Sequence, residues 1–156
     1  MKTIRFIFIS FWVAVFFSCT STRQPSIGTP APQILFSLKH TGKYRVHIQS
    51  ARMNMTGILI VKPAGDEWRG SMVNEFGIKA FDFIVKKQKC RLLNTVSLLN
   101  KWYIRKIIAN DLSFLFRAAQ RGDVVRGKSL TFQANGEFRI RNEQQYIEYI
   151  FQPMTE

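Results

Sequence analysis

The stretch Ser129–Asn142, with the sequence SLTFQANGEFRIRN, decides the fold because it predicts an antiparallel hairpin with one register. A two-residue loop would set the apolar side chains of one strand against the arginines of the other. A three-residue loop, with Gly136 in the left-handed conformation, instead pairs Phe132 with Phe138. We choose the second register because it gives the hairpin a continuous apolar face.

Strand patterns extend on both sides of this hairpin. After it, Gln145–Gln152 alternates, with Ile147, Tyr149 and Phe151 on one face. Before it, six runs read as strands: Ile34–Leu38, Tyr44–Ile48, Met55–Val61, Trp68–Val73, Phe76–Lys87 and Lys89–Asn94. The apolar phase shifts within the fifth run, which predicts a bulge near Ala80.

A different pattern separates the sixth strand from the hairpin. In residues 97–120 apolar side chains recur mostly at steps of three or four, which predicts one long helix or two short ones. The alternative of two helices places the break near Asn110-Asp111, where either residue could cap a new start. Gly122 would end the helical region. Arg105, Lys106 and Asp111 exclude a membrane span here.

The order of these elements predicts a mainly β, α+β domain. Consecutive hairpins favour one antiparallel sheet, and so long a sheet must curl. The 14 phenylalanines among 156 residues exceed what a flat sheet could hide on one face. We therefore expect a curled antiparallel sheet or incomplete β-barrel, with the helical insertion packed on the concave face.

The first residues have the three-part layout of an export signal. Lys2 and Arg5 precede the apolar run Phe6–Phe17, which is shorter than the roughly 20 residues of a membrane-spanning helix. The sequence Phe16-Phe17-Ser18-Cys19 resembles a lipobox, where signal peptidase cuts before a diacylated cysteine. This predicts a signal peptide at 1–18, palmitate-type lipid on Cys19 and a flexible tether at 19–33. An ordinary secretory signal with a coincidental cysteine is the alternative.

The net charge of +13 favours polyanionic partners. Export removes most nucleic-acid targets, so anionic lipid headgroups are the nearer partner and nucleic acid is not expected. The alternative is a solvated surface that is basic without having a polyanionic partner. Thr20 follows Cys19 where some bacteria place an aspartate to retain lipoproteins in the inner membrane. The expected location is therefore the periplasm-facing side of the bacterial outer membrane.

Catalytic and metal-binding motifs are missing from the sequence. His40 and His47 are the only histidines, and no nucleophile elbow or HExxH motif accompanies them. With Cys19 acylated, Cys90 is a lone thiol, and a buried inert thiol is the default expectation. We expect no enzyme, no metal and no cofactor.

Residues Lys43–Phe116 resemble the LolA/LolB-like lipoprotein carriers of the bacterial envelope. The likeness lies in Thr56–Ile60, in Trp68 of the next strand, in Asn74–Phe83 and in Leu112–Phe116. Residues 34–156 would then form one LolA/LolB-like β domain. The chain is shorter than typical members, and no exposed apolar loop of the kind the family's membrane-anchored receptor uses is evident.

The resemblance implies a half β-barrel with a helical lid over a cavity for acyl chains. Six apolar residues are candidates for lining that cavity: Phe81, Phe83, Val85, Trp102, Phe132 and Phe138. The expected function is binding of lipid or of lipoprotein acyl chains, with membrane lipid, other lipoproteins or a periplasmic carrier as partners. The alternative is a structural or interaction lipoprotein with a packed core and no ligand.

Overall fold

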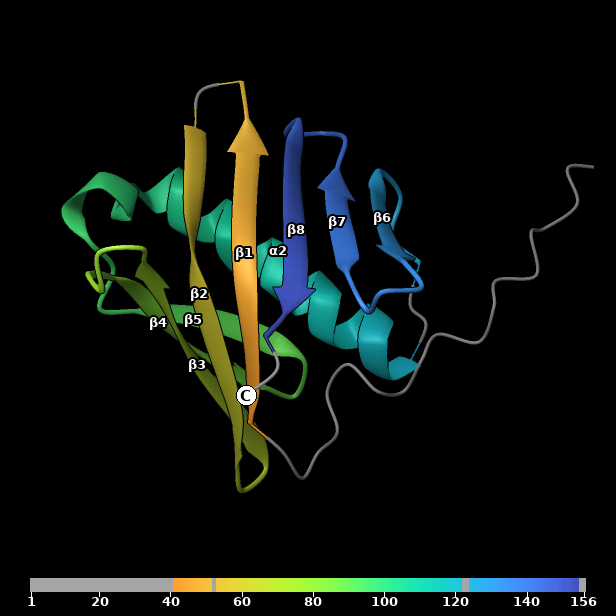
Figure 1. Ribbon diagram of the computed structural model, residues 1–156, viewed down its shortest axis with the longest axis horizontal. Coiled ribbons are helices and arrows are strands. Elements are labelled where there is room, and N and C mark those ends of the chain that lie inside the picture. The colour runs from red at the N-terminus through yellow and green to blue at the C-terminus, as the bar shows by residue number, and fades with distance from the viewer. Residues whose placement is uncertain (1–40, 52, 122–123, 155–156) are drawn as a thin grey trace, which may run out of the picture. The chain divides into compact units, whose positions relative to one another are not determined.

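The computed structural model describes residues 41–51, 53–121 and 124–154, which form one antiparallel sheet and one long helix (Figure 1). The strands are β1 (Gly42–Ser50), β2 (Met53–Ala64), β3 (Glu67–Asn74), β4 (Lys79–Lys86), β5 (Lys89–Leu93), β6 (Lys128–Phe132), β7 (Phe138–Asn142) and β8 (Ile147–Pro153). The expected mainly β fold, a curled half-barrel sheet, is confirmed. The predicted strand at Ile34–Leu38 and the predicted helix stop at Gly122 lie outside the described residues.

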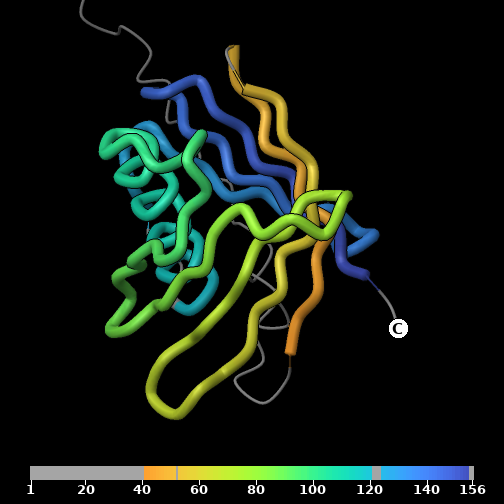
Figure 2. The backbone as a smooth tube through the Cα atoms, turned by 90° about the vertical axis from the view of Figure 1, so that its left-hand side faces the viewer, coloured from red at the N-terminus to blue at the C-terminus, as the bar shows by residue number. Residues whose placement is uncertain are grey.

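The strand order β5-β4-β3-β2-β1-β8-β7-β6 requires the helix to cross the whole sheet. The chain leaves the sheet at β5, makes the short 3-10 helix η2 (Ser97–Leu99), continues into α2 (Trp102–Arg121) and re-enters at β6. Because β5 and β6 are opposite ends of the sheet, α2 lies across its concave face (Figures 1 and 2). Strand β1, which is first in sequence, is central because it pairs with both β2 and β8.

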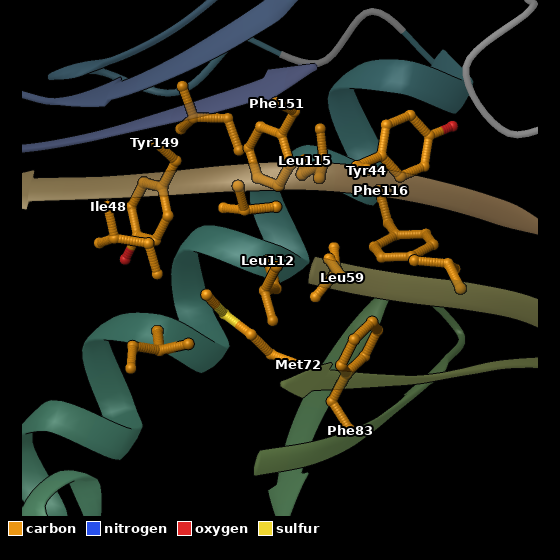
Figure 3. Packing of buried hydrophobic residues seen from close by; sticks show 14 of the residues in the cluster. Tyr44, Ile48, Leu59, Met72, Phe83, Leu112, Leu115, Phe116, Tyr149 and Phe151 are labelled. Carbon is orange, nitrogen blue, oxygen red and sulfur yellow. The ribbon is translucent and has the colours of Figure 1, made fainter. Parts of the chain in front are cut away.

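The core is the layer between α2 and the concave face. Figure 3 shows side chains from β1, β2, β3, β4 and β8 pointing toward those of the helix. The helix contributes six buried apolar side chains: Ile108, Leu112, Phe114, Leu115, Phe116 and Ala118. Burial of that face, rather than helix propensity, is the main source of the helix's stability.

The hairpin β6–β7 has the predicted register. Phe132 is paired with Phe138 and Leu130 with Ile140. The backbone N–H of Gln133 donates to the carbonyl of Glu137 at 2.8 Å, which closes the loop. Gly136 has φ of +82°, so the left-handed residue of the loop is where the sequence places it.

For the strand predicted at Phe76–Lys87, the predicted bulge is confirmed but the predicted start is wrong, because β4 begins at Lys79. Between β3 and β4 the register shifts from Met72–Phe81 to Val73–Lys79, which leaves Ala80 as the extra residue. Residues 75–78 form a turn instead of a strand. Asn74 Oδ1 accepts the backbone N–H groups of residues 76 and 78, and Gly77 takes φ of +76°.

The helix α2 runs unbroken through Asn110-Asp111, so of the two predicted alternatives the single helix is confirmed. Asp111 faces the sheet and is completely buried. Its Oδ1 accepts hydrogen bonds from Lys128 Nζ at 2.6 Å and Asn142 Nδ2 at 2.8 Å, and its Oδ2 accepts one from the Tyr149 hydroxyl at 2.8 Å. One carboxylate therefore joins α2 to β6, β7 and β8.

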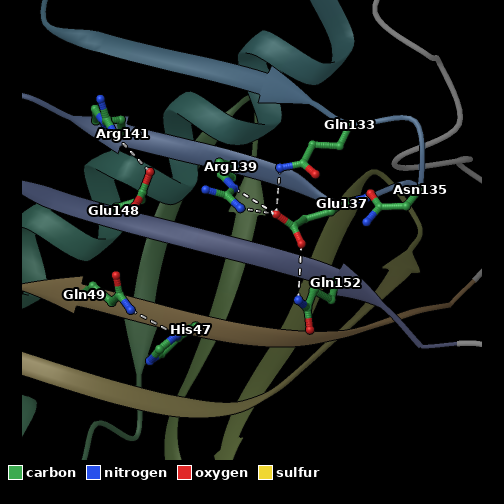
Figure 4. A network of polar contacts seen from close by, with 9 residues as sticks. All are labelled: His47, Gln49, Gln133, Asn135, Glu137, Arg139, Arg141, Glu148 and Gln152. Carbon is green, nitrogen blue, oxygen red and sulfur yellow. Dashed lines mark hydrogen bonds and ion pairs between the residues drawn. The ribbon is translucent and has the colours of Figure 1, made fainter.

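The opposite, convex face of the sheet carries polar pairs. Around Glu137, the side chains of Arg139, Gln133 and Gln152 all donate to the carboxylate (Figure 4). The bonds from Arg139 and Gln152 lower the pKa of Glu137. On the same face Asp82 accepts a bond from Lys79 Nζ at 3.1 Å. These contacts satisfy surface groups among themselves.

Cys90 lies on β5 against the helix. Its backbone N–H donates to Ser113 Oγ at 2.8 Å, and its side chain packs against the core. Burial raises the pKa of the Cys90 thiol to about 12. The thiol is therefore protonated and a poor nucleophile at neutral pH.

Replacing Asp111 should destabilise the fold strongly. We expect Asp111→Ala to lower the free energy of unfolding by about 3–5 kcal/mol, because Lys128 would keep a largely buried charge without its partner. The matched control is Glu148→Ala, which removes the exposed pair with Arg141 and should cost about 1 kcal/mol or less. Urea unfolding followed by tryptophan fluorescence measures both. Equal losses in the two variants would contradict the role assigned to Asp111.

Cys90 should react slowly in the folded chain. In a Cys19→Ser chain, where Cys90 is the one remaining cysteine, we expect slow labelling by a maleimide at neutral pH and rapid labelling in urea. A chain that also carries Ser129→Cys, at an exposed position of β6, provides the fast-reacting control. Comparable rates at positions 90 and 129 would show that the Cys90 thiol is accessible.

Candidate functional site

Four of the six residues predicted to line a cavity lie in the core. Phe81, Phe83, Val85 and Phe138 are buried on the concave face. The ring of Phe83 meets that of Phe116 on α2 at 6.3 Å between centroids, and the ring of Phe138 stacks on Phe151 at 4.5 Å. These side chains fill the space beneath the helix with the protein's own atoms.

The other two residues lie at the margin of this layer. Phe132, on β6, is half-buried and contacts Phe138, with 6.1 Å between ring centroids. Trp102, the first residue of α2, has 75% of its surface exposed. The structure therefore does not bring all six residues together around one space.

An apolar groove opens instead between the N-terminal half of α2 and one end of the sheet. Its volume is about 690 Å³, which is in the range of ligand-binding pockets, about 300–1,000 Å³. One wall is η2 and the first two turns of α2. The other wall comes from the β1–β2 turn and the β7–β8 turn. None of the six predicted cavity residues lines it.

The groove has an apolar floor and a mixed rim. Leu99, Ile108 and Ile147 are buried at the floor, and Met53, Ile104 and Ile107 are half-buried above them. The rim carries exposed aliphatic and aromatic side chains together with polar ones: Leu98, Tyr103, Tyr146, Lys101 and Gln145.

This arrangement suits an elongated apolar ligand with a polar end. The apolar part gains free energy by leaving water, about 25 cal/mol for each square ångström buried. The polar end can remain in water at the rim, where Lys101 supplies one positive charge. No histidine, cysteine, aspartate or glutamate lines the groove.

Sequence reasoning missed the groove because its walls come from three separate places in the chain. A partial signal was the apolar character of Met53, Ile104 and Ile107. These side chains pack against the edge of the core and are only half-buried. It also missed the turn between β3 and β4, where Phe76 has 86% and Ile78 has 60% of its surface exposed.

Other candidate chemistry is weak in the part of the chain that the structure describes. His47 lies on the convex side of β1 and shares hydrogen bonds with Asn54 and Gln49. No cluster of metal-binding side chains occurs among the described residues. Within the same residues, no helix combines the length and the apolar character that a bilayer crossing requires.

The predicted signal peptide at 1–18, the acylation site at Cys19 and the tether at 19–33 lie outside the described residues. Within the described domain, the groove combines a volume of about 690 Å³ with an apolar floor. Comparison with protein-family models finds no match to this chain, and comparison with curated proteins finds none.

Proposed function

We propose that this chain is a membrane-anchored lipoprotein of the bacterial envelope that binds an acyl chain, of a lipid or of another lipoprotein, in its apolar groove. The signal-like residues 1–18 and Cys19 support the attachment to a membrane. The groove between α2 and the ends of the strands carries the binding part of the proposal.

The distribution of polarity along the groove supports an acyl chain over a polar ligand. Polar atoms gather at the rim, while Leu99, Ile108 and Ile147 at the floor offer hydrocarbon alone. A sugar or nucleotide would lose its hydrogen bonds to water on entering such a floor, at a cost of roughly 1–3 kcal/mol for each unpaired group. An alkyl chain has no such loss.

The half-barrel fold with a helix on its concave side supports the same class of ligand through the resemblance to LolA/LolB-like carriers. The exposed Phe76 and Ile78 in the β3–β4 turn are further apolar surface of the kind a carrier presents to a partner or a bilayer. A periplasmic carrier or another lipoprotein is the partner that this reading favours. Outer-membrane residence follows from the same resemblance and from Thr20.

One observation favours a second function, that of a structural or interaction lipoprotein without a ligand. The space beneath the middle of α2 is filled, and Asp111 ties the helix to three strands. A lid that opens widely is therefore disfavoured. The two functions differ in whether the groove takes up hydrocarbon.

Binding of a fluorescent fatty acid, and its displacement by palmitate, tests the groove. We expect Ile107→Gln to weaken binding about ten-fold, since it removes apolar contact worth roughly 1.5 kcal/mol or more and places an unpaired amide in the groove. The control Ile150→Gln changes a half-buried isoleucine on the convex face and should leave binding unchanged. Absence of binding, or equal loss in both variants, would favour the structural function.

Metabolic labelling with radioactive palmitate tests the anchor. We expect Cys19→Ser to abolish labelling, because a diacyl group is joined to that sulfur in a lipoprotein. Cys90→Ser removes the other cysteine and should leave labelling intact. Label that persists in Cys19→Ser and disappears in Cys90→Ser would refute the assignment of the site.

A further inference from the structure

The start of α2 exposes more apolar surface than a solvated helix end requires. Leu98 in η2 has 76% of its surface exposed, and Trp102 has 75%. Tyr103 is exposed beside them, and its ring meets that of Trp102 edge to face, with 6.1 Å between centroids. Large apolar side chains grouped in this way mark a surface that contacts a protein or a membrane.

Positive charge surrounds these side chains. In the sequence, Lys101 lies between Leu98 and Trp102, and Arg105 and Lys106 follow Tyr103. Residues 96–110 contain no Asp or Glu. Arg105 donates to the carbonyl of Leu92 at 3.1 Å and so helps to hold the helix on β5. The side chains of Lys101 and Lys106 are exposed and form no ion pair or hydrogen bond with other described residues.

The position of these lysines opposes the stability of the helix itself. The first turn of α2 carries no acidic residue, and positive charge at a helix N-terminus is unfavourable. An anionic surface placed against this end would turn that repulsion into attraction. The charges thus complement a negative partner rather than the fold.

We propose that Leu98, Lys101, Trp102, Tyr103 and Lys106 form a docking surface for an anionic lipid bilayer. Trp and Tyr favour the boundary between headgroups and acyl chains, where an apolar ring and a polar atom are both satisfied. Leu98 enters the acyl region beside them. Lys101 and Lys106 lie against anionic headgroups, each adding attraction near a charged leaflet.

The docking surface is continuous with the groove. Leu98, Lys101 and Tyr103 belong to both, since they form part of the rim of the groove. Docking therefore places the mouth of the groove at the bilayer. The inference rests on the proposed function and deepens it: an acyl chain passes between membrane and groove without crossing water.

The chain between Cys19 and β1 is long enough for this orientation. It reaches at most roughly 80 Å when extended. Strand β1, with nine residues, is only about 30 Å long. A lipid anchor at Cys19 therefore permits the start of α2 to reach the same membrane.

Quenching of Trp102 by brominated lipid tests the docking. The full chain is reconstituted in vesicles of phosphatidylethanolamine with about one quarter phosphatidylglycerol, and in vesicles of phosphatidylcholine alone. The Trp102 signal is the difference between the lipidated wild-type chain and its Trp102→Phe variant, because Trp68 is common to both and Trp12 leaves with the predicted signal peptide. We expect quenching in the anionic vesicles and much less in the neutral ones.

Charge variants show which surface docks. Lys101→Gln and Lys106→Gln should each lower the ratio of docked to undocked chain about five-fold. The matched control for both changes together is Lys87→Gln with Lys89→Gln, which removes the same two charges at the β4–β5 turn. Val124→Ser controls for apolar area, since Val124 has 92% of its surface exposed beyond the other end of α2. Both controls should leave quenching unchanged.

The outcomes separate the docking from the anchor and from the groove. Unquenched Trp102 in a chain that carries label on Cys19 overturns the docking and leaves the anchor in place. An equal effect of the control lysines overturns the docking surface as well and points to general attraction. Quenching that persists in Ile107→Gln supports docking even where fatty-acid binding is lost. Binding of the fatty acid without any quenching of Trp102 would support the groove as a binding site and refute the docking surface.

Discussion

The constraint on which the structure depends is that a curled sheet must cover its concave apolar face. The chain meets it with one connection, because β5 and β6 are the two ends of the sheet and the segment between them has to cross everything else. Helix α2 is therefore both the link and the cover. Asp111 fixes where along the sheet it lies, since a buried carboxylate is tolerated only with its three donors in place.

A single straight helix cannot follow a curved surface along its whole length. From Asp111 onward α2 is buried against the sheet, with Phe114, Leu115 and Phe116 filling the layer. Toward its start the helix leaves the strand ends, and the space between is the groove. The same geometry that completes the core at one end leaves the groove at the other.

Patterns that depend on near neighbours could be read from the sequence. The hairpin register followed from the phase of Phe132 and Phe138 around Gly136, and the bulge from the shift of phase at Ala80. The turn at 75–78 was missed because Phe76 resembles a strand residue, although Gly77 was a signal. Asp111 was read as a cap, yet its spacing from Ile108, Leu112 and Leu115 already placed it on the apolar face. The groove depends on contacts between distant segments, which no local pattern contains.

The central place of β1 has a consequence for how the molecule is made. Its partner on one side, β2, follows at once, whereas its partner on the other side, β8, is separated from it by roughly a hundred residues. During synthesis the edge of β1 that pairs with β8 therefore stays unpaired until the end of the chain is made, and such non-local pairing is slow to form. Until Ile147–Pro153 has been synthesised, the open strand edge of β1 is available for pairing with other chains, so this topology exposes the unfinished chain to aggregation.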